Sequence, residues 1–298
     1  MRVSGRRLRV ALPLLARKPG GRRVRRALGV LRQIRSAAGA SRDLDVGVAL
    51  LEERIRGEEA PSRELRTLLR RLRAARARSR ARMAETLMDL EIARLRRHLR
   101  RVLSRRGEGL FAVLLRLGQE RDARGASLLA ALAWLGDGYD PDALHRLRIG
   151  ARRLRYVAEL SEGLKGTPAD ASDLFKDVQE RLGHIRDAYV LSAWLGRQAQ
   201  SARARGQEAL AAEAAAQQAW FLERSRSHHR EFLEADVAGT VPRGLEALGA
   251  SAGPAPERPA GRAYNANRDM QRERSLPDAS TDHSTRDRRA PGNPGHTR

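Results

Sequence analysis

The sequence predicts an all-α fold in which one helical unit occurs twice, followed by a disordered C-terminal tail. Leu and Ala are frequent and β-branched residues are few, a balance that favours helix over sheet. Hydrophobic residues make up 41% of the 298 residues, enough for a core, but aromatic residues make up only 4%, so we expect an aliphatic core. Two motifs also recur in the same order at nearly equal spacing, which indicates a duplicated unit.

The stretch 144–160 predicts one long helix around which the rest of the chain is organised. Its apolar stripe consists of Leu144, Leu147, Ala151, Leu154 and Ala158. The row beside it, called the basic row below, consists of His145, Arg148, Arg152 and Arg155. A second apolar patch lies beyond the row: Ile149, Tyr156 and Leu160. A cationic row between two apolar surfaces is expected to lie between packed neighbours; the alternative is a solvated face in an Arg-rich protein.

The beginning of this helix has a counterpart near the N-terminus. Residues of the segment 2–10 match residues of 148–156 at an offset of 146, and the matching residues are Arg2, Val3, Arg6, Arg7, Leu8, Arg9 and Val10. Further along each copy, 39–43 matches 183–187 at an offset of 144. A two-residue insertion or deletion in a connecting loop accounts for the change of offset.

These residues resemble the CHAD family, the conserved-histidine α-helical domain. The second copy carries the family's H-x-x-R-x-x-x-R-R-L-R-Y pattern from His145 to Tyr156, and its later L-G-x-x-R-D element from Leu182 to Asp187. The resemblance covers about 1–236. The first copy departs from the pattern, because Met1 stands where the second copy has Leu147, so its histidine is missing. We expect either a misplaced start codon or the loss of the head of the first helix.

The resemblance implies two pseudo-symmetric antiparallel helical bundles around a basic central groove that binds inorganic polyphosphate. We predict polyphosphate-binding residues on the two matched helices, in the L-G-x-x-R-D element and in the matching segment 39–43: Arg2, Arg6, Arg9, Arg42, His145, Arg148, Arg152, Arg153, Arg155 and Arg186. We expect binding without turnover, with no catalytic residue, cofactor or metal. The sequence also lacks E-x-E-x-K, the motif of the tunnel-type triphosphatase often joined to this family.

We predict a helical domain over 1–236, with an N-terminally truncated repeat 1 at about 1–125, repeat 2 at about 126–236, and a disordered tail over 237–298. In repeat 1 we expect helices up to about residue 16, over 22–56 and from 61 to about 106, then apolar helical pieces at 111–117 and 127–135. Arginines surround most of the circumference of 70–82, so we expect that stretch to be exposed or to bind an anion.

Repeat 2 has clearer helix boundaries. Asp140 and Pro141 predict an N-cap and a first helical residue, and 166–168 predicts the turn that ends this helix. Further helices are expected around 174–189 and over 207–236. The tail is rich in Pro, Gly, Ser, Asn and charge and has almost no periodic apolar residues, so we expect disorder.

Most of the formal charge of +23 lies in the helical part. Residues 239–298 hold 10 Arg and 7 acidic residues, a net of +3, which leaves +20 for 1–238. Such an excess favours polyanionic partners. All basic residues except three lysines are arginines, a bias that a GC-rich genome would also produce. A guanidinium can nevertheless grip phosphate oxygens in a bidentate manner, which an ammonium group cannot.

Several other classes of site lack support in the sequence. Neither G-x-x-x-x-G-K-S/T nor G-x-G-x-x-G occurs, which argues against a Gly-rich nucleotide cradle, and the absence of Cys excludes thiolate metal sites. His228 and His229 are adjacent and diverge on a helix, so they make a poor metal site. His145 lies among arginines, where a hydrogen bond to phosphate is expected and a satisfied core histidine is the alternative. Asp43 and Asp187 are expected to hold an arginine of the 144–160 helix, or else to form ordinary surface ion pairs.

The rival function is nucleic-acid binding, which the net charge favours equally. That function calls for base-stacking aromatics or a helix free to enter a groove, whereas the basic row is flanked by apolar surface. An enzyme acting on polyphosphate would need an acid, base or metal constellation that the sequence does not offer. Without a membrane-length apolar run or a signal-peptide core, we expect a cytoplasmic protein, with polyphosphate granules as a candidate location.

Overall fold

The computed structural model describes residues 2–90, 92–103 and 109–249, apart from the side chains of residues 2, 3 and 40. Helices make up nearly all of this part, and no strand occurs in it, which confirms the all-α prediction. The described helices are α1 (Arg2–Leu15), α2 (Arg22–Arg56), α3 (Arg63–Met88), α4 (Ile92–Leu103), α5 (Leu110–Leu135), α6 (Pro141–Lys165), α7 (Asp170–Arg203), α8 (Glu208–Glu234) and α9 (Val237–Ala247). None of these helices is long and apolar enough to cross a membrane.

Side chains cap both α3 and α6, and the cap predicted for α6 is confirmed. The Ser62 hydroxyl accepts a hydrogen bond from the backbone N–H of Leu65 at 2.9 Å. The Asp140 carboxylate accepts from the backbone N–H groups of Asp142 and Ala143, and Pro141 follows it in the first turn. Gly166 ends α6 in the left-handed conformation at φ 69°, where a residue without a Cβ is favoured.

The Arg-rich helix predicted from 61 to about 106 is two helices. α3 ends at Met88, and the apolar side of α4 then packs against α2 in a cluster with Leu31, Ile34 and Leu95. A single straight helix would have carried that apolar side away from α2, so the break between α3 and α4 allows its burial.

Helix α5 is continuous where two separate pieces were predicted. Gly125 lies in its middle and is buried, and a Cβ at this position would stand 2.7 Å from a side-chain carbon of Leu245 in α9. The glycine therefore permits a close helix contact and does not mark a break. The division between the two repeats at about 125 and 126 stays a prediction; those residues lie inside α5.

The beginning of the predicted tail is helical, which corrects the boundary at 236. The Asp236 carboxylate caps α9 by accepting from the Gly239 N–H at 3.1 Å. Val241, Leu245 and Leu248 are buried in the same core as the apolar stripe of α6. Their 4-3 spacing is helical, but the Gly and Pro content of the segment concealed it. The remaining residues predicted to be disordered, 250–298, lie outside the described part.

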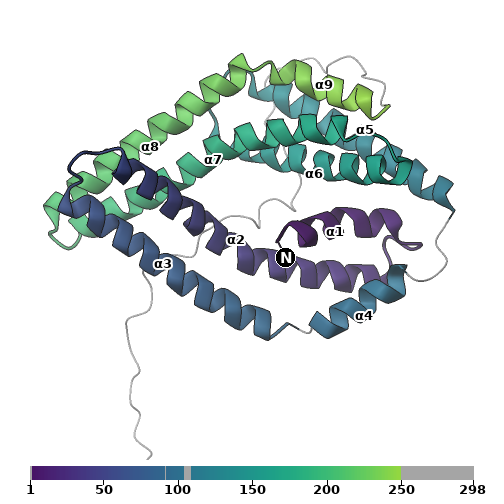
Figure 1. The fold of residues 1–298 in the computed structure, drawn as a ribbon, viewed down its shortest axis with the longest axis horizontal. Coiled ribbons are helices and arrows are strands. Elements are labelled where there is room, and N and C mark those ends of the chain that lie inside the picture. The colour runs from purple at the N-terminus through teal and green to yellow at the C-terminus, as the bar shows by residue number, and fades with distance from the viewer. Residues whose placement is uncertain (1, 91, 104–108, 250–298) are drawn as a thin grey trace, which may run out of the picture. The chain divides into compact units, whose positions relative to one another are not determined.

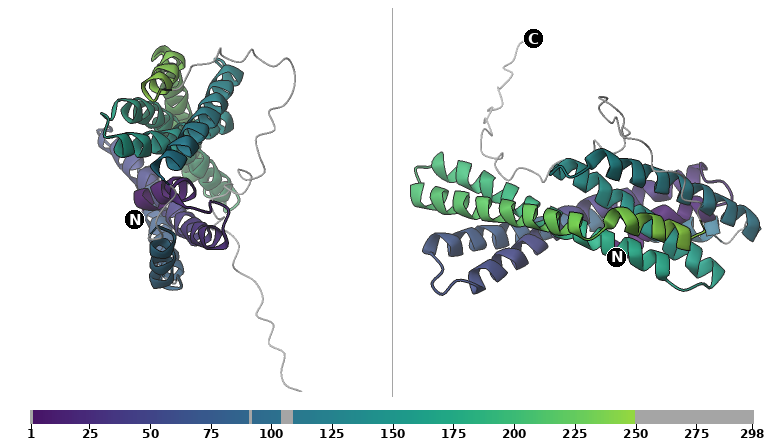
Figure 2. Two further views of the ribbon diagram at one scale, coloured as in Figure 1. Left: turned by 90° about the vertical axis from the view of Figure 1, so that its right-hand side faces the viewer. Right: turned by 90° about the horizontal axis from the view of Figure 1, so that it is seen from above.

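Each of the first three helices of repeat 1 lies against the helix that has the same place in repeat 2 (Figure 1). α1 packs on α6, α2 on α7 and α3 on α8, while α8 and α9 follow one another along one edge (Figure 2). One buried cluster draws on α2, α3, α7 and α8 together. The two predicted repeats therefore share a core. A second cluster buries the whole predicted apolar stripe of α6 against α7 and α9.

Candidate functional site

The basic row lies on α6 between two packed surfaces, as its sequence pattern predicts. On one side the apolar stripe of α6 is buried in the core. On the other side Ile149 and Tyr156 are only 3% and 6% exposed. All four members of the row, His145, Arg148, Arg152 and Arg155, are partly buried, and so is the neighbouring Arg153. Their charges therefore lie at least partly out of bulk solvent, where electrostatic interactions are less screened.

Helix α1 brings arginines of the first copy to the same region. The Nε of Arg6 donates a hydrogen bond to the Tyr156 hydroxyl at 3.1 Å. Leu14 of α1 packs with Val157 of α6 in one buried cluster. Arg9 is partly buried in the same helix. Arg2 begins α1, and its side chain lies outside the described part.

A carboxylate that the sequence analysis did not single out joins the two helices. Glu159 of α6 accepts two hydrogen bonds from Arg7 of α1, at 2.7 and 3.1 Å, and one from Arg155 at 2.9 Å. The hydrogen bond to Glu159 raises the pKa of Arg7 despite an opposing effect of burial. The i,i+4 spacing of Arg155 and Glu159 is a signal that could have identified this pair. Arg155, predicted to face polyphosphate, is thus partly neutralised.

Arg148 is the centre of a charged cluster that draws on three helices. Burial lowers the pKa of its guanidinium, while the negative charge of Asp187 on α7 opposes that shift, and Arg42 and Asp43 on α2 and Arg186 on α7 also interact with it. The L-G-x-x-R-D element of the second predicted repeat and the matching segment 39–43 of the first therefore meet at this arginine. The Nε of Arg148 is buried and has no hydrogen-bond partner among the described residues.

The two aspartates of the cluster lie among its arginines. Burial raises the pKa of Asp43, and the positive charges of Arg186, Arg148 and Arg42 oppose this rise. Three guanidinium groups face two carboxylates, so the cluster retains a positive charge when all five groups are ionised. The arrangement can hold Arg148 in position and still attract an anion.

The glycine of the second L-G-x-x-R-D element makes room for Arg148. A Cβ on Gly183 would stand 3.7 Å from the Nε of Arg148, which is ordinary contact distance. Helix α7 continues through Gly183 without a break. The guanidinium thus lies against the helix backbone, and a side chain longer than Ala at 183 would push it away.

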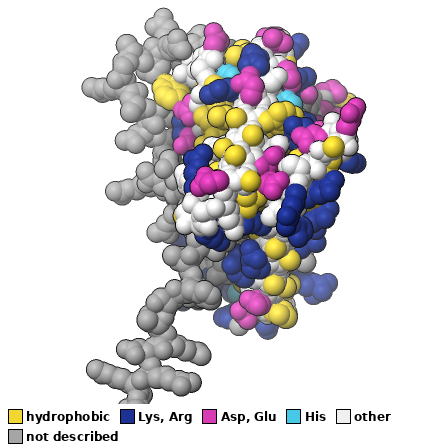
Figure 3. Space-filling view, turned by 90° about the vertical axis from the view of Figure 1, so that its left-hand side faces the viewer, with side chains coloured by type: hydrophobic (Ala, Val, Ile, Leu, Met, Phe, Trp, Pro, Cys, Tyr) yellow, Lys and Arg dark blue, Asp and Glu magenta, His cyan; other side chains and the backbone are white. Residues whose placement is uncertain are grey.

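Cationic side chains also gather away from the basic row. Lys and Arg cluster in the lower part of the face in Figure 3, where α3 lies. This helix buries Leu65, Leu68 and Leu72 and keeps most of its arginines exposed, while Arg71 and Arg76 are partly buried. Arg73 and Arg80 pair with Glu52 and Asp45 of α2, each at 2.7 Å. Most arginines of α3 are therefore exposed, one of the two outcomes expected for 70–82, and Arg73 and Arg80 help to hold α3 against α2.

The histidines form no metal cluster in the part of the chain that the structure describes: no group of three His, Cys, Asp or Glu side chains is placed to hold an ion. His229 is buried between the rings of Tyr139 and Phe232, and burial lowers its pKa. His228 faces Glu231, with 3.0 Å between Nδ1 and the carboxylate. His228 and His229 both have partners on α8, His229 also contacts Tyr139, and neither belongs to the basic row.

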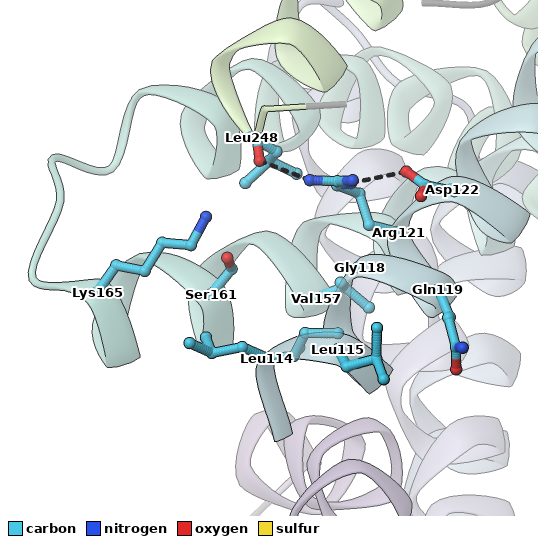
Figure 4. Close-up of a pocket in the computed structure, with 11 residues that line it drawn as sticks. Leu114, Leu115, Gly118, Gln119, Arg121, Asp122, Val157, Ser161, Lys165 and Leu248 are labelled. Carbon is cyan, nitrogen blue, oxygen red and sulfur yellow. Dashed lines mark hydrogen bonds and ion pairs between the residues drawn. The ribbon is translucent and has the colours of Figure 1, made fainter. Parts of the chain in front are cut away.

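A cavity of about 360 Å³ lies outside the basic row, between α5, the end of α6 and the end of α9. Figure 4 shows Leu114, Val157 and Leu248 on its walls and Lys165 at one side. Arg121 crosses it and is held by the Leu248 carbonyl at 2.9 Å and by Asp122 at 2.8 Å. Because its guanidinium is already bound, this cavity is a weaker anion site than the basic row.

Comparison with known proteins gives a family assignment. Residues 1–196 and 133–290 each match the family model described as the CHAD domain. No curated protein and no solved structure matches the chain.

Proposed function

Since the chain belongs to the CHAD domain family, we propose that it binds inorganic polyphosphate and does not turn it over. The sequence motifs that carry the resemblance, and the function it implies, lie on the helices that form the charged region. We assign binding to the ten residues predicted from the motifs: Arg2, Arg6, Arg9, Arg42, His145, Arg148, Arg152, Arg153, Arg155 and Arg186.

The observation that supports this proposal best is the position of Arg148. It is a partly buried guanidinium on the basic row, it lies beside Arg42 and Arg186, and its Nε has no hydrogen-bond partner among the described residues. A buried donor without a partner is costly, and a phosphate oxygen would satisfy it. A linear polyphosphate carries such oxygens at every unit, so one chain could contact successive turns of α6.

Binding without turnover is supported by the carboxylates near the basic row, which interact with guanidinium groups. Asp43 and Asp187 lie in the arginine cluster, and Glu159 is bound to Arg7 and Arg155. A general base needs a carboxylate free to accept a proton from an attacking water, and these three interact with guanidinium groups. We propose a cytoplasmic protein that polyphosphate granules recruit.

The test compares two pairs of arginines. Fluorescence anisotropy with labelled long-chain polyphosphate, at one fixed salt concentration, gives the affinity of the wild type and of Arg148→Ala/Arg152→Ala. A charged hydrogen bond contributes about 1.5–3 kcal/mol, so losing two should weaken binding by roughly a hundredfold or more. Circular dichroism should show unchanged helical content.

The matched control is Arg76→Ala/Arg78→Ala on α3, which removes the same charge from a surface away from the row. This control should bind within about threefold of the wild type. Equal losses in the two pairs would mean diffuse attraction and contradict the site. Shortening of the polymer on incubation with Mg²⁺ would contradict binding without turnover. Equal displacement of labelled polyphosphate by unlabelled polyphosphate and by duplex DNA would contradict the preference for polyphosphate.

A further inference from the structure

Helix α4 carries a second cationic surface, separate from the basic row. The segment 92–103 contains five arginines and one histidine and no acidic residue. All five arginines are exposed: Arg94, Arg96, Arg97, Arg100 and Arg101. No ion pair joins Arg96, Arg97, Arg100 or Arg101 to an acidic side chain of the described residues, unlike Arg73 and Arg80 on α3. Four charges on this helix are therefore not neutralised by acidic side chains within 2–90, 92–103 and 109–249.

The opposite side of α4 is already used for packing. Leu95 is buried, and Leu99 and Val102 pack against the same cluster as Leu31 and Ile34 of α2. Figure 1 shows α4 on the side of α2 that faces away from α6 and α7. A helix that lies in a membrane surface inserts its apolar side into the lipid, and here that side is occupied. The free face of α4 is cationic.

The arginines of α4 form two lines along the helix. At 3.6 residues per turn, Arg96 and Arg100 follow i,i+4 spacing on one flank, and Arg94, Arg97 and Arg101 follow i,i+3,i+7 spacing on the other. A helix about 10–12 Å across fits the major groove of B-form DNA, about 12 Å wide, whose two walls each carry a line of phosphates. A single polyphosphate chain offers only one such line.

We propose that the exposed arginine face of α4 binds the phosphate backbones of duplex DNA, as a site distinct from the proposed polyphosphate site. The narrow major groove of duplex RNA does not admit side chains in this way. Single-stranded nucleic acid is held largely by stacking on aromatic rings, and α4 has no Phe, Tyr or Trp. Recognition through phosphates is independent of base sequence and depends strongly on salt.

The experiment measures binding of a fluorescein-labelled 20-base-pair duplex of mixed sequence by anisotropy, between 50 and 200 mM salt. Arg97→Ala/Arg101→Ala should lower the affinity at least tenfold and reduce the slope of log K against log salt by about 2, one for each lost phosphate contact. Ala is the best helix former, so α4 should stay helical. Arg97→Lys/Arg101→Lys keeps the charge and should retain the slope.

Two controls separate this site from others. Arg197→Ala/Arg203→Ala removes two exposed arginines of α7 and should leave DNA binding within about twofold. Arg148→Ala/Arg152→Ala should also leave DNA binding unchanged, while Arg97→Ala/Arg101→Ala should leave polyphosphate binding within about threefold. The α4 proposal and the polyphosphate proposal can therefore fail independently.

The following outcomes would overturn the α4 proposal. They are an unchanged affinity and salt slope in Arg97→Ala/Arg101→Ala, an equal loss of DNA binding in Arg148→Ala/Arg152→Ala, and binding of single-stranded DNA as tight as that of the duplex. If Arg97→Ala/Arg101→Ala lost binding to vesicles rich in anionic lipid but retained duplex binding, the face would be assigned to a membrane surface instead.

Discussion

Arg6 in α1 and Tyr156 in α6 are joined by a hydrogen bond of 3.1 Å although 150 residues separate them in the sequence. Both belong to the matched segments of the two predicted repeats. The contact therefore joins the two related helices directly, and it positions an arginine of the first copy beside the basic row of the second. Tyr156 was expected only to contribute apolar surface, yet its hydroxyl supplies the polar contact between the helices.

Tyr156→Phe tests this contact. The substitution keeps the buried ring and removes the hydroxyl, so the free energy of unfolding should fall by about 1 kcal/mol, the contribution of one partly buried hydrogen bond. Urea denaturation followed by circular dichroism measures the change. A variant as stable as the wild type would show that the Arg6–Tyr156 bond does not help to hold α1 on α6.

Glu159→Gln removes the carboxylate that binds Arg7 and Arg155. Both guanidinium groups then lose an anionic partner, so affinity for polyphosphate should rise several-fold at low salt, and the gain should shrink as salt screens the charges. Stability should fall by no more than about 1 kcal/mol, because the pair is partly exposed.

Glu120→Gln is the matched control for that variant, because Glu120 pairs with Arg124 of α5 at 2.6 Å and neither belongs to the proposed site. It should leave polyphosphate affinity unchanged. Weaker polyphosphate binding by Glu159→Gln would mean that Glu159 holds Arg155 in its binding position.

His229 should make stability depend on pH. Burial lowers its pKa in the folded state, whereas in the unfolded chain the imidazole titrates near its ordinary value of about 6.5. The unfolded state then binds more protons below that pH, so the stability contributed by neutral His229 is present above about pH 6.5 and is lost as the pH falls through the lowered pKa.

His229→Leu has no imidazole to protonate at this position, so its stability should decline less than that of the wild type between pH 7 and pH 5. Urea midpoints at a series of pH values give the comparison. Parallel decline in the two proteins would contradict this account of His229.

Truncation tests the corrected domain boundary. A chain that ends at residue 249 keeps α9 and should unfold at nearly the same temperature as the full chain. A chain that ends at 236 uncovers Phe175 and the neighbouring core, and it loses four buried apolar side chains worth about 1.5–3 kcal/mol each. Equal melting temperatures for the two truncated chains would show that α9 adds nothing to the fold.

The sequence predicted helix α6 well because its residues obey local rules. Asp140, Pro141 and Gly166 have strong positional preferences at helix ends, and the 3-4 spacing of the apolar stripe defines the buried face. The partial burial of the basic row could be predicted in the same way. Its side chains lie between two apolar surfaces of one helix, and burial of those surfaces also buries part of the row.

The features that sequence reasoning missed depend on tertiary contacts. Two separate helical pieces were expected at 111–117 and 127–135, whereas α5 is one helix in which Gly125 admits Leu245 of α9. The break between α3 and α4 allows α4 to pack on α2, and the position of α2 cannot be predicted from the local sequence around the break. The contact between Arg7 and Glu159 joins residues 152 positions apart, so its partner could not be chosen from spacing within one helix.

Hydrogen–deuterium exchange with and without long-chain polyphosphate tests the central claim most directly, because it maps the bound surface without any substitution. Saturating polyphosphate should slow amide exchange in the α6 segment 144–160 and in the α1 segment 6–15, and it should leave the middle of α3, residues 70–82, unchanged. Protection confined to α3 or α4, with none in α6, would contradict the proposal that the basic row binds polyphosphate.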